Sequence, residues 1–561
     1  MPADVGLVLA PADSGALTAA LVLVLVSMLV ALSRRRPRDF PPAPPGVRAW
    51  PLLGHLPALG PEPHRTLAAW SHGCCDVLGL RFGTDDVVVL NSLEAMREAL
   101  VARGDAFSSR PRMFMMDIFS DGGKGLVFRN FGKSLMEQRK FGMVVFRDIL
   151  SKPRTETMMI REAQTLASVL ARTAGRPTRV HENIGLSLLN VMCSLCFGRR
   201  FDTSDPKFRG FVQSLDTFAK NAACCQLFNI CPTLARVPKI NTPAVRVKAG
   251  IREVKEFVRS ETEGHKVKFD KGNIRDIIDA FLLEMESRRR SGRDLGSFTE
   301  REMEQVILYL TFSSRARRPA RRVCGGPCFS SDGVPGHLDR LLLATTPPHG
   351  FKGSNVPSSL QVIFDLFFTG AETSSTCLRW AVFLMAVYPD IQARIHRELD
   401  SVLGPDGEVT LDKRAALPFV DATISEVLRF RPAAPFMYRC ATKDSKLRDY
   451  FIPADTQVLV NLWSIHMDPK HWQDPDQFNP DRFLNPEGAV KIPEAFKAFG
   501  LGRRLCFGEQ MARMEIFLFF AILMRHFTFT LSEGAPAPNT MGVFALTLSP
   551  PPHELCIFKR Q

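Results

Sequence analysis

Residues 499–508 read Phe-Gly-Leu-Gly-Arg-Arg-Leu-Cys-Phe-Gly and place one cysteine, Cys506, on a glycine-rich loop in front of a long apolar stretch. Gly502 and Gly508 supply the backbone freedom that a tight loop requires. Residues 509–529 have the length and the apolar content of a buried helix. The pattern therefore predicts that Cys506 lies at the amino end of that helix.

The position of Cys506 favours the ionised sulfur, which is the form that ligates metals. The positive end of the helix dipole, the free amides of the first turn and the adjacent Arg504 all stabilise a thiolate. A single thiolate with no second cysteine or histidine nearby cannot complete a tetrahedral zinc site, but it can be the axial ligand of a haem. The alternative for any one of the 13 cysteines is a buried side chain that only packs.

The spacing of five residues in this loop resembles that of a known family. Phe499, Gly502, Arg504, Cys506 and Gly508 match the haem-thiolate loop of the cytochrome P450 family position for position. The resemblance implies that Cys506 is the proximal iron ligand of haem b. It also implies that Phe499 packs near the sulfur and that Arg504 reaches a haem propionate.

The fold that the resemblance implies is mainly α with a smaller β-rich region. Residues 77–80 and 87–90 have the pattern of strands and place that region near the amino end. The implied activity is a monooxygenase reaction, in which one oxygen atom from O2 enters a lipophilic substrate and the other leaves as water. The implied partners are NADPH-cytochrome P450 reductase, which passes on electrons from NADPH, and cytochrome b5.

A long apolar helix is expected over residues 364–386, with polar residues inside it at 369–374. One reading is a small kink that packs against a neighbour. The segment is similar to the oxygen-binding groove of the family's distal helix, and by that resemblance Thr373 steadies bound oxygen while Glu372 and water relay protons. Thr369 stands where the family more often has alanine or glycine, so a narrower pocket is expected.

A second motif combines Glu426 and Arg429, which share one face of a helix expected over residues 421–430. Such pairs are common on exposed helices and alone mean little. Residues 461–474, expected to be irregular and rich in aromatic side chains, lead to a second arginine, Arg482. The three resemble the family's buried Glu-Arg-Arg network, whose role is structural.

Three further arginines match family positions that reach the haem edge, namely Arg110, Arg139 and Arg439. The family usually has a tryptophan four residues before the second of these, where this chain has Leu135. One propionate hydrogen bond is therefore expected to be absent.

Residues 1–40 are expected to form a retained signal anchor and its basic stop. Residues 16–32 are almost entirely apolar, and with residues 5–10 they reach the roughly 20 residues of a membrane-spanning helix. Four arginines follow: Arg34, Arg35, Arg36 and Arg38. This order predicts a lumenal amino terminus and a cytosolic catalytic domain at the endoplasmic reticulum membrane. A cleaved signal peptide, the alternative, has its positive charge first.

The net charge of +14 does not indicate nucleic-acid binding, because no base-reading motif accompanies it. It favours the membrane surface and an acidic partner. Arg139, Lys140 and Arg503 suit docking of the reductase. Adjacent and scattered cysteines indicate a reduced cytosolic setting, and Cys193 and Cys196 lie in an apolar helical stretch where they are expected to be core.

The catalytic domain is expected over residues 41–311 and 354–561, interrupted by residues 312–353. That interruption has no periodicity, and its flanks repeat, since residues 305–312 echo residues 361–368. We interpret it as a surface insertion or a misjoined segment.

An apolar wall of Phe114, Met115, Met116 and Phe119 suggests fatty acids, steroids or xenobiotics as substrates. The motifs resemble microsomal members of the second P450 family and its fatty-acid-hydroxylating branch. Two alternatives stay open: a reductase-independent isomerase or lyase of the same fold, and a haem-binding membrane protein impaired in catalysis.

Overall fold

The structure is a computed structural model that describes residues 36–292 and 358–560, with Val22 and Leu25. Short gaps within these ranges are 52, 73, 121–124, 223–227, 229–233, 236, 238–240, 535 and 546. The predicted insertion at 312–353 and nearly all of the predicted anchor at 16–32 lie outside the described residues. Among those described, none of the helices has both the length and the hydropathy needed to cross a bilayer.

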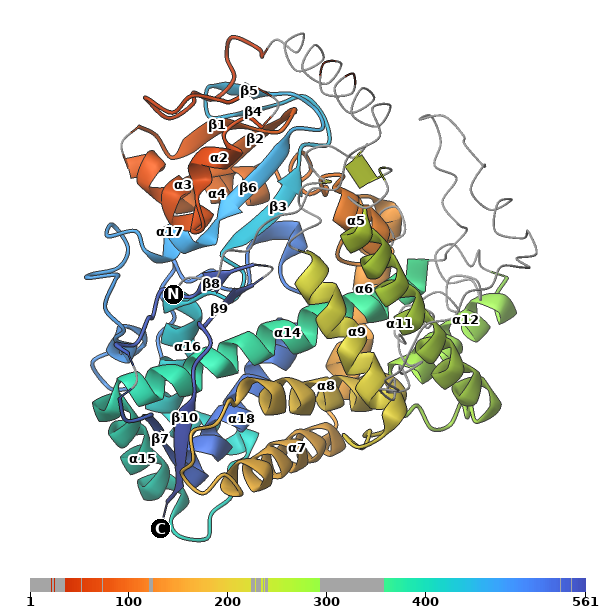
Figure 1. The fold of residues 1–561 in the computed structure, drawn as a ribbon. Coiled ribbons are helices and arrows are strands. Elements are labelled where there is room, and N and C mark those ends of the chain that lie inside the picture. The colour runs from red at the N-terminus through yellow and green to blue at the C-terminus, as the bar shows by residue number, and fades with distance from the viewer. Residues whose placement is uncertain are drawn as a thin grey trace, which may run out of the picture.

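A four-stranded sheet forms the smaller, β-rich part of the molecule (Figure 1). Its order is β1 (Val77–Phe82), β2 (Asp85–Leu90), β6 (Gln457–Asn461) and β3 (Phe436–Cys440). Only the β2–β6 pair is parallel. The two strands predicted at 77–80 and 87–90 are confirmed. Both faces of the sheet are covered, which explains why β1 and β2 read as nearly continuous apolar runs.

The helices make up most of the described chain, as expected. They are α2 (Leu56–Leu59), α3 (Pro63–His72), α4 (Leu93–Arg97), α5 (Phe114–Ser120), α6 (Lys133–Leu150), α7 (Pro153–Ala171), α8 (His181–Phe197), α9 (Pro206–Ala222), α11 (Thr242–Val267), α12 (Ile277–Arg290), α14 (Ser358–Val387), α15 (Pro389–Leu403), α16 (Pro418–Phe430), α17 (Leu462–His466) and α18 (Glu509–His526). Short helical turns are η1 (Glu98–Ala102), η3 (Leu411–Ala416), η4 (Pro480–Phe483) and η5 (Gly502–Arg504).

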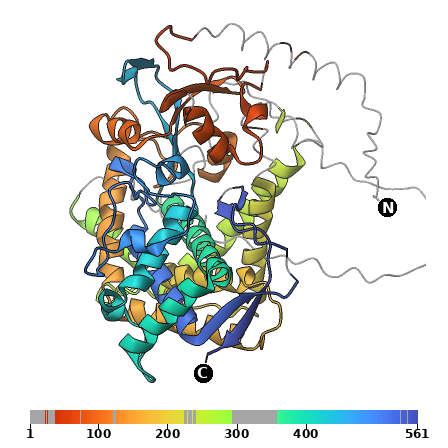
Figure 2. The same ribbon diagram turned by 90° about the vertical axis from the view of Figure 1, so that its left-hand side faces the viewer.

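The long helix α14 runs through the helical part of the molecule and packs on α8 and α18 (Figures 1 and 2). It contains the helix predicted over 364–386. Its buried carboxyl-terminal half carries Trp380 at the centre of the core. The neighbouring α8 buries Cys193 and Cys196 as free thiols, which confirms that these two cysteines are core residues.

Two sequence expectations about element boundaries are wrong. The helix expected over 509–529 ends at His526, and Phe527 opens β7 (Phe527–Leu531), which pairs with β10 (Leu555–Lys559). Apolar content alone does not separate a helix from a strand, whereas the alternating aromatic and threonine residues of β7 favour the strand. The stretch 461–474 is not wholly irregular, because the Asn461 side chain caps the short helix α17.

The remaining strands form two small pairs: β4 (Ser445–Leu447) with β5 (Tyr450–Ile452), and β8 (Val543–Phe544) with β9 (Leu548–Ser549). The β8–β9 pair is bonded directly to α14, since Trp380 Nε1 donates to the carbonyl of Leu548 at 2.8 Å.

Candidate active site

The cysteine loop is a fixed turn between η5 and α18. The Cys506 amide donates to the carbonyl of Phe499 at 2.9 Å. Gly502 has a φ of +77°, and a Cβ there would lie 2.2 Å from the Leu100 carbonyl oxygen, so this position requires glycine. Gly508 has a φ of −92° and open space around it. The expectation that Gly508 supplies backbone freedom is therefore wrong.

The Cys506 side chain is accessible, yet burial raises the pKa of its thiol. The Gly508 amide and then Arg139 act in the opposite direction and favour the thiolate, while Glu509 disfavours it. The expectation that the position of Cys506 favours the ionised sulfur is therefore wrong for the protein alone, because burial outweighs the groups that stabilise the thiolate. Metal coordination deprotonates a thiol outright, so a raised thiol pKa before binding is compatible with a ligand role.

The cation that acts on Cys506 is Arg139 rather than the adjacent Arg504. The Arg504 guanidinium is buried and donates to the carbonyls of Ser108 at 2.9 Å and Leu126 at 3.1 Å. The expectation that Arg504 favours the ionised sulfur is therefore corrected, because its hydrogen bonds hold it on neighbouring backbone.

Helix α6 carries Arg139 to the cysteine loop. Arg139 donates to the carbonyl of Leu505 at 2.8 Å. Gly142 allows close contact, since a Cβ there would lie 2.8 Å from the Phe507 ring. Leu135, where the family usually has tryptophan, is buried on the same helix. The helix and the loop therefore form one packed unit around the thiol.

Four arginines converge beside this unit. Arg439 is buried, and its pKa lies well below the usual value, first because of burial and then because of Arg110, Arg504 and Arg139. No residue in the described part of the chain accepts a hydrogen bond from Arg439 Nε. A buried cation with an unused donor and three like charges around it is costly unless an anion binds there. The carboxylates of haem propionates fit this requirement.

Backbone carbonyls hold two of these arginines, Arg110 and Arg439. Arg110 Nε donates to Val127 at 2.6 Å, and Arg110 also donates to the carbonyl of Tyr438. Tyr438 also accepts from Arg439 at 2.9 Å. These contacts connect β3 to the loops that lead into α6, so strand and loop together fix the positions of the cations.

Helix α14 contributes the acidic residue of the site. Glu372 Oε1 accepts from the hydroxyls of Thr376 at 3.4 Å and Thr547 at 3.3 Å. Burial raises the pKa of the Glu372 carboxyl. The neighbouring Gly370 lies close to α8, since a Cβ there would be 3.1 Å from the sulfur of Met192. Thr373 follows on the same helix and is half-buried, while the side chain of Thr369 lies outside the described residues.

The structure brings Glu426 and Arg429 together at full burial. The guanidinium donates to both carboxylate oxygens, at 2.6 and 2.7 Å. It also donates to the carbonyls of His466 at 2.8 Å and Pro475 at 3.0 Å. The pair therefore ties α16 to the end of α17 and to the segment that follows it.

Arg482 completes this cluster from η4. Its Nε lies 3.5 Å from Glu426, and its terminal nitrogen donates to the carbonyl of Asp474 at 2.6 Å. The amide of Asn479 also donates to Glu426, at 2.9 Å. Glu426 thus accepts hydrogen bonds from Arg429 of its own helix and from the Asn479 amide, and it forms an ion pair with Arg482 of that same distant segment.

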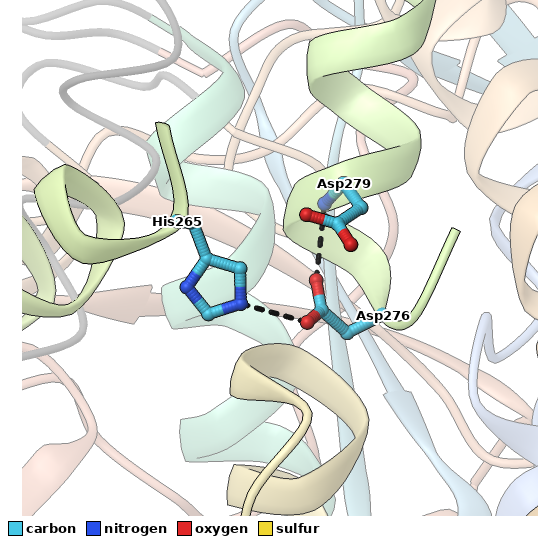
Figure 3. A group of neighbouring side chains, drawn as sticks. All are labelled: His265, Asp276 and Asp279. Atoms are coloured by element: carbon cyan, nitrogen blue, oxygen red, sulfur yellow. Dashed lines mark hydrogen bonds and ion pairs between the residues drawn. The ribbon is translucent and has the colours of Figure 1, made fainter. Parts of the chain in front are cut away.

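A group that the sequence did not indicate lies between α11 and α12 (Figure 3). His265, Asp276 and Asp279 place ligand-type atoms within 4.8 Å of one another. Each carboxylate already has donors, however. Asp276 accepts from His265 Nε2 at 2.7 Å and from the Asp279 amide at 3.0 Å, while Arg275 pairs with Asp279 at 2.7 Å. The group, called the His265–Asp276–Asp279 latch below, is therefore a hydrogen-bonded cluster that caps the amino end of α12 and links it to α11.

This latch predicts a pH-dependent contribution to stability. Burial lowers the pKa of His265, but the hydrogen bond and charge of Asp276 outweigh burial, so the folded-state pKa lies above 6.5. The contribution, on the order of 1 kcal/mol, is fully present below pH 6.5 and is lost as the pH rises through the folded pKa. Thermal midpoints of the protein and of His265→Gln should converge across that window. A constant difference at every pH would contradict the prediction.

A thiol on a fixed loop, a long helix with a buried acid, and a cluster of arginines around a buried cation with an unused donor are features that a haem-thiolate enzyme requires. The family model described as Cytochrome P450 matches residues 44–314 and 338–557, and the chain belongs to this family. It is therefore a monooxygenase, and the family implies haem, O2 and electrons supplied by a reductase.

Relatives match the chain over nearly its whole length. Cytochrome P450 2U1 of Mus musculus is 32% identical over 572 residues, covering 98% of this chain and 96% of the relative. Cytochrome P450 2D3 of Rattus norvegicus is 31% identical, with 98% and 99% covered. Cytochrome P450 2J2 of Homo sapiens is also 31% identical, with 96% and 95% covered.

Proposed function

We propose that the chain is an NADPH-dependent monooxygenase that inserts one oxygen atom from O2 into a lipophilic substrate such as a fatty acid, a steroid or a xenobiotic. The observation that carries the proposal is the accessible Cys506 thiol packed against α6 and beside Arg439, a buried cation with an unused donor. Haem supplies the binding and reductive activation of O2 when it is held there. The chain supplies its ligand, its counter-charges and its protons.

Cys506 is the proposed iron ligand, with its amide fixed by Phe499. Arg439 and Arg110 lie on the side of β3, and Arg504 and Arg139 come from the loop and α6. Together they are proposed to neutralise the propionates. Glu426, Arg429 and Arg482 act at a distance by holding the segment that precedes the cysteine loop.

On α14, Glu372 and Thr373 are the proposed proton-handling pair. The carboxyl of Glu372 has a raised pKa because it is buried, so it can be protonated closer to neutral pH than an exposed glutamate. A raised pKa brings a carboxyl closer to the pH at which it both accepts and donates protons efficiently. Thr373, the next residue on the helix, orients the hydrogen bonds at the reacting oxygen.

Apolar side chains near α5 support the lipophilic substrate class. Phe114 lies 5.2 Å from Phe228, ring centre to ring centre, and Phe228 is fully buried. The side chains of Met115, Met116 and Phe119 lie outside the described residues. An aromatic pair at this place favours apolar substrates but does not select one of them.

The electron donor proposed is a membrane-bound flavoprotein reductase, with cytochrome b5 as a second partner. Lys140 is exposed on α6 beside the cysteine loop. Arg503 is exposed as well but pairs with Asp105 at 3.0 Å, so its charge is already partly neutralised. An acidic docking surface would meet this cationic side of the protein.

We further propose that residues 1–40 anchor the chain in the endoplasmic reticulum membrane with the catalytic domain in the cytosol. Residues 312–353 stay proposed as an insertion or a misjoined segment. Peptide mapping of the native protein tests this point, and recovered peptides that span 312–353 would exclude misjoining.

Reconstitution with the reductase tests the proposed function. Haem-loaded protein, NADPH and 18O2 should give a product that carries one labelled oxygen, and Glu372→Gln should lower the product formed per NADPH by about 10²-fold. Product formed without reductase and without labelled oxygen would indicate an isomerase or lyase. Haem binding without any product from fatty acids, steroids and xenobiotics would indicate an impaired protein.

Replacing Arg439 with leucine should weaken haem retention and stabilise the haem-free protein. Without haem, Arg439 is a buried cation with an unused donor, and leucine removes that cost. With haem, the variant loses a charged hydrogen bond worth about 1.5–3 kcal/mol. Haem dissociation rates and thermal midpoints of the haem-free protein measure the two effects. The exposed Arg448→Leu is the control, and equal destabilisation of both forms would contradict the prediction.

A further inference from the structure

The carboxyl of Glu372 is held by a segment that lies 175 residues away in the chain. Thr547 donates its hydroxyl to Oε1 at 3.3 Å, and Thr376, one turn further along α14, donates to the same oxygen at 3.4 Å. The two hydroxyls are themselves 3.4 Å apart. Glu372 is therefore directed toward the β8–β9 segment by two donors, and only one of them belongs to its own helix.

The backbone that carries Thr547 is rigidly docked. Its neighbour Leu548 accepts from the fully buried Trp380 at 2.8 Å and donates to the carbonyl of Ala433 at 3.0 Å. The carbonyl of Thr547 accepts from the Ala545 amide at 3.1 Å. These bonds tie the segment to α14 and to the residues that follow α16, so the hydroxyl has a fixed position relative to Glu372.

A second hydroxyl extends the contact toward solvent. Ser549 Oγ lies 3.1 Å from Thr547 Oγ1, and either atom can donate. Thr547 is buried, whereas Ser549 is only half-buried and can exchange hydrogen bonds with water. The Glu372 carboxyl, the buried Thr547 hydroxyl and the half-buried Ser549 hydroxyl thus form a continuous chain of hydrogen bonds that leads from α14 toward solvent.

The charge that faces Glu372 comes from its own helix. Burial is the main influence on its pKa and raises it, and Arg379 followed by the hydroxyls of Thr547 and Thr376 acts to lower it. Arg379 Nε is buried, and the described residues offer it no hydrogen-bond acceptor. The β8–β9 segment brings hydroxyls to Glu372, and His553 lies beyond, where it faces Arg379.

We propose that Thr547 is the positioning residue for Glu372 and that protons reach Glu372 from solvent through Ser549 and Thr547. The proposal rests on the proposed proton-handling role of Glu372. In each transfer the Thr547 hydroxyl gives its proton to the Glu372 carboxylate and takes the proton of the Ser549 hydroxyl, which water replaces. No electrons are exchanged in this relay.

The test compares Thr547→Val, which removes the hydroxyl at nearly constant volume, with Thr547→Ser, which retains it. Haem-loaded full-length variants are reconstituted with reductase, NADPH and O2. Product per NADPH should fall on the order of tenfold in Thr547→Val, with a matching rise in hydrogen peroxide, and should stay within about twofold in Thr547→Ser. Thr530→Val in β7 is the control for the same substitution in a strand, and it should not change either quantity.

A readout without turnover separates positioning from a general structural effect. The infrared carboxyl stretch of Glu372, identified by its absence in Glu372→Gln, should titrate at higher pH in Thr547→Val because one donor to the ionised form is lost. It should titrate normally in Thr547→Ser. Ser549→Ala should leave this titration unchanged but lower product per NADPH, since it interrupts only the proton path.

The outcomes distinguish this inference from the function on which it rests. If Glu372→Gln leaves product per NADPH unchanged, the proposed role of Glu372 fails. If Glu372→Gln lowers it while Thr547→Val changes neither the coupling nor the titration, the positioning role of Thr547 is wrong. If Ser549→Ala couples normally, the route through Ser549 is wrong.

Discussion

Cys506→Ser is expected to abolish monooxygenation and the long-wavelength band of the reduced, carbon monoxide-bound protein. A serine hydroxyl is a far weaker electron donor than a thiolate, and O–O bond cleavage depends on that donation. The loop itself should survive, because it is fixed by the amide of residue 506 and by the left-handed Gly502 rather than by the sulfur. The loss therefore reports on ligation rather than on folding.

The control for this variant is Cys556→Ser, because Cys556 lies on β10 and its thiol contacts Ser532. It should retain both the band and the activity. A Cys506→Ser protein that kept the long-wavelength band would contradict the assignment of Cys506 as ligand. Loss of the band in both variants would indicate a general effect on folding.

The sequence predicts an element correctly where its local residue pattern and its tertiary packing favour the same secondary structure. The loop at 499–508, the strands near residue 80 and the long helix α14 each have a pattern that tertiary packing does not override. The end of α18 could not be predicted in this way, since Phe527 suits a buried helix and a buried strand equally well. Its pairing with β10 decides between the two.

The contacts of the site were harder to predict because they depend on side-chain direction. The sequence places Arg504 next to Cys506, but backbone carbonyls hold its guanidinium, and Arg139 from α6 acts on the thiol instead. Thr547 carries no sequence signal that points to Glu372. The contact between Thr547 and Glu372 depends on the packing of β9 against Trp380, which is seen only in the structure.

The Glu426–Arg429 pair shows what residue spacing alone can and cannot predict. Spacing of three residues predicts a shared helix face, and the structure adds that both side chains are completely buried. The carbonyls that accept from Arg429 belong to residues 466, 475 and 477, which no local pattern connects to α16. Burial, rather than the pair itself, is what makes the interaction important for stability.

Glu426→Gln is therefore expected to destabilise the protein by about 3–5 kcal/mol, because Arg429 remains as a buried charge without its counter-ion. The amide of glutamine replaces one acceptor oxygen with a donor, which also opposes the donor groups of Arg429 and Asn479. The yield of folded haem protein and the thermal midpoint should both fall.

The chain offers a matched control for this variant, since Glu62 and Arg65 have the same spacing and pair at 3.1 Å on the surface, with each side chain more than a third exposed. Glu62→Gln should change stability by no more than about 1 kcal/mol, because solvent screens the pair and replaces the lost contact. If the two glutamine variants had equal effects, burial would not be the source of the stabilisation, and Glu426 would not hold the segment before the cysteine loop. A large loss confined to Glu426→Gln, together with faster haem release, would show that this ion pair stabilises the site from a distance.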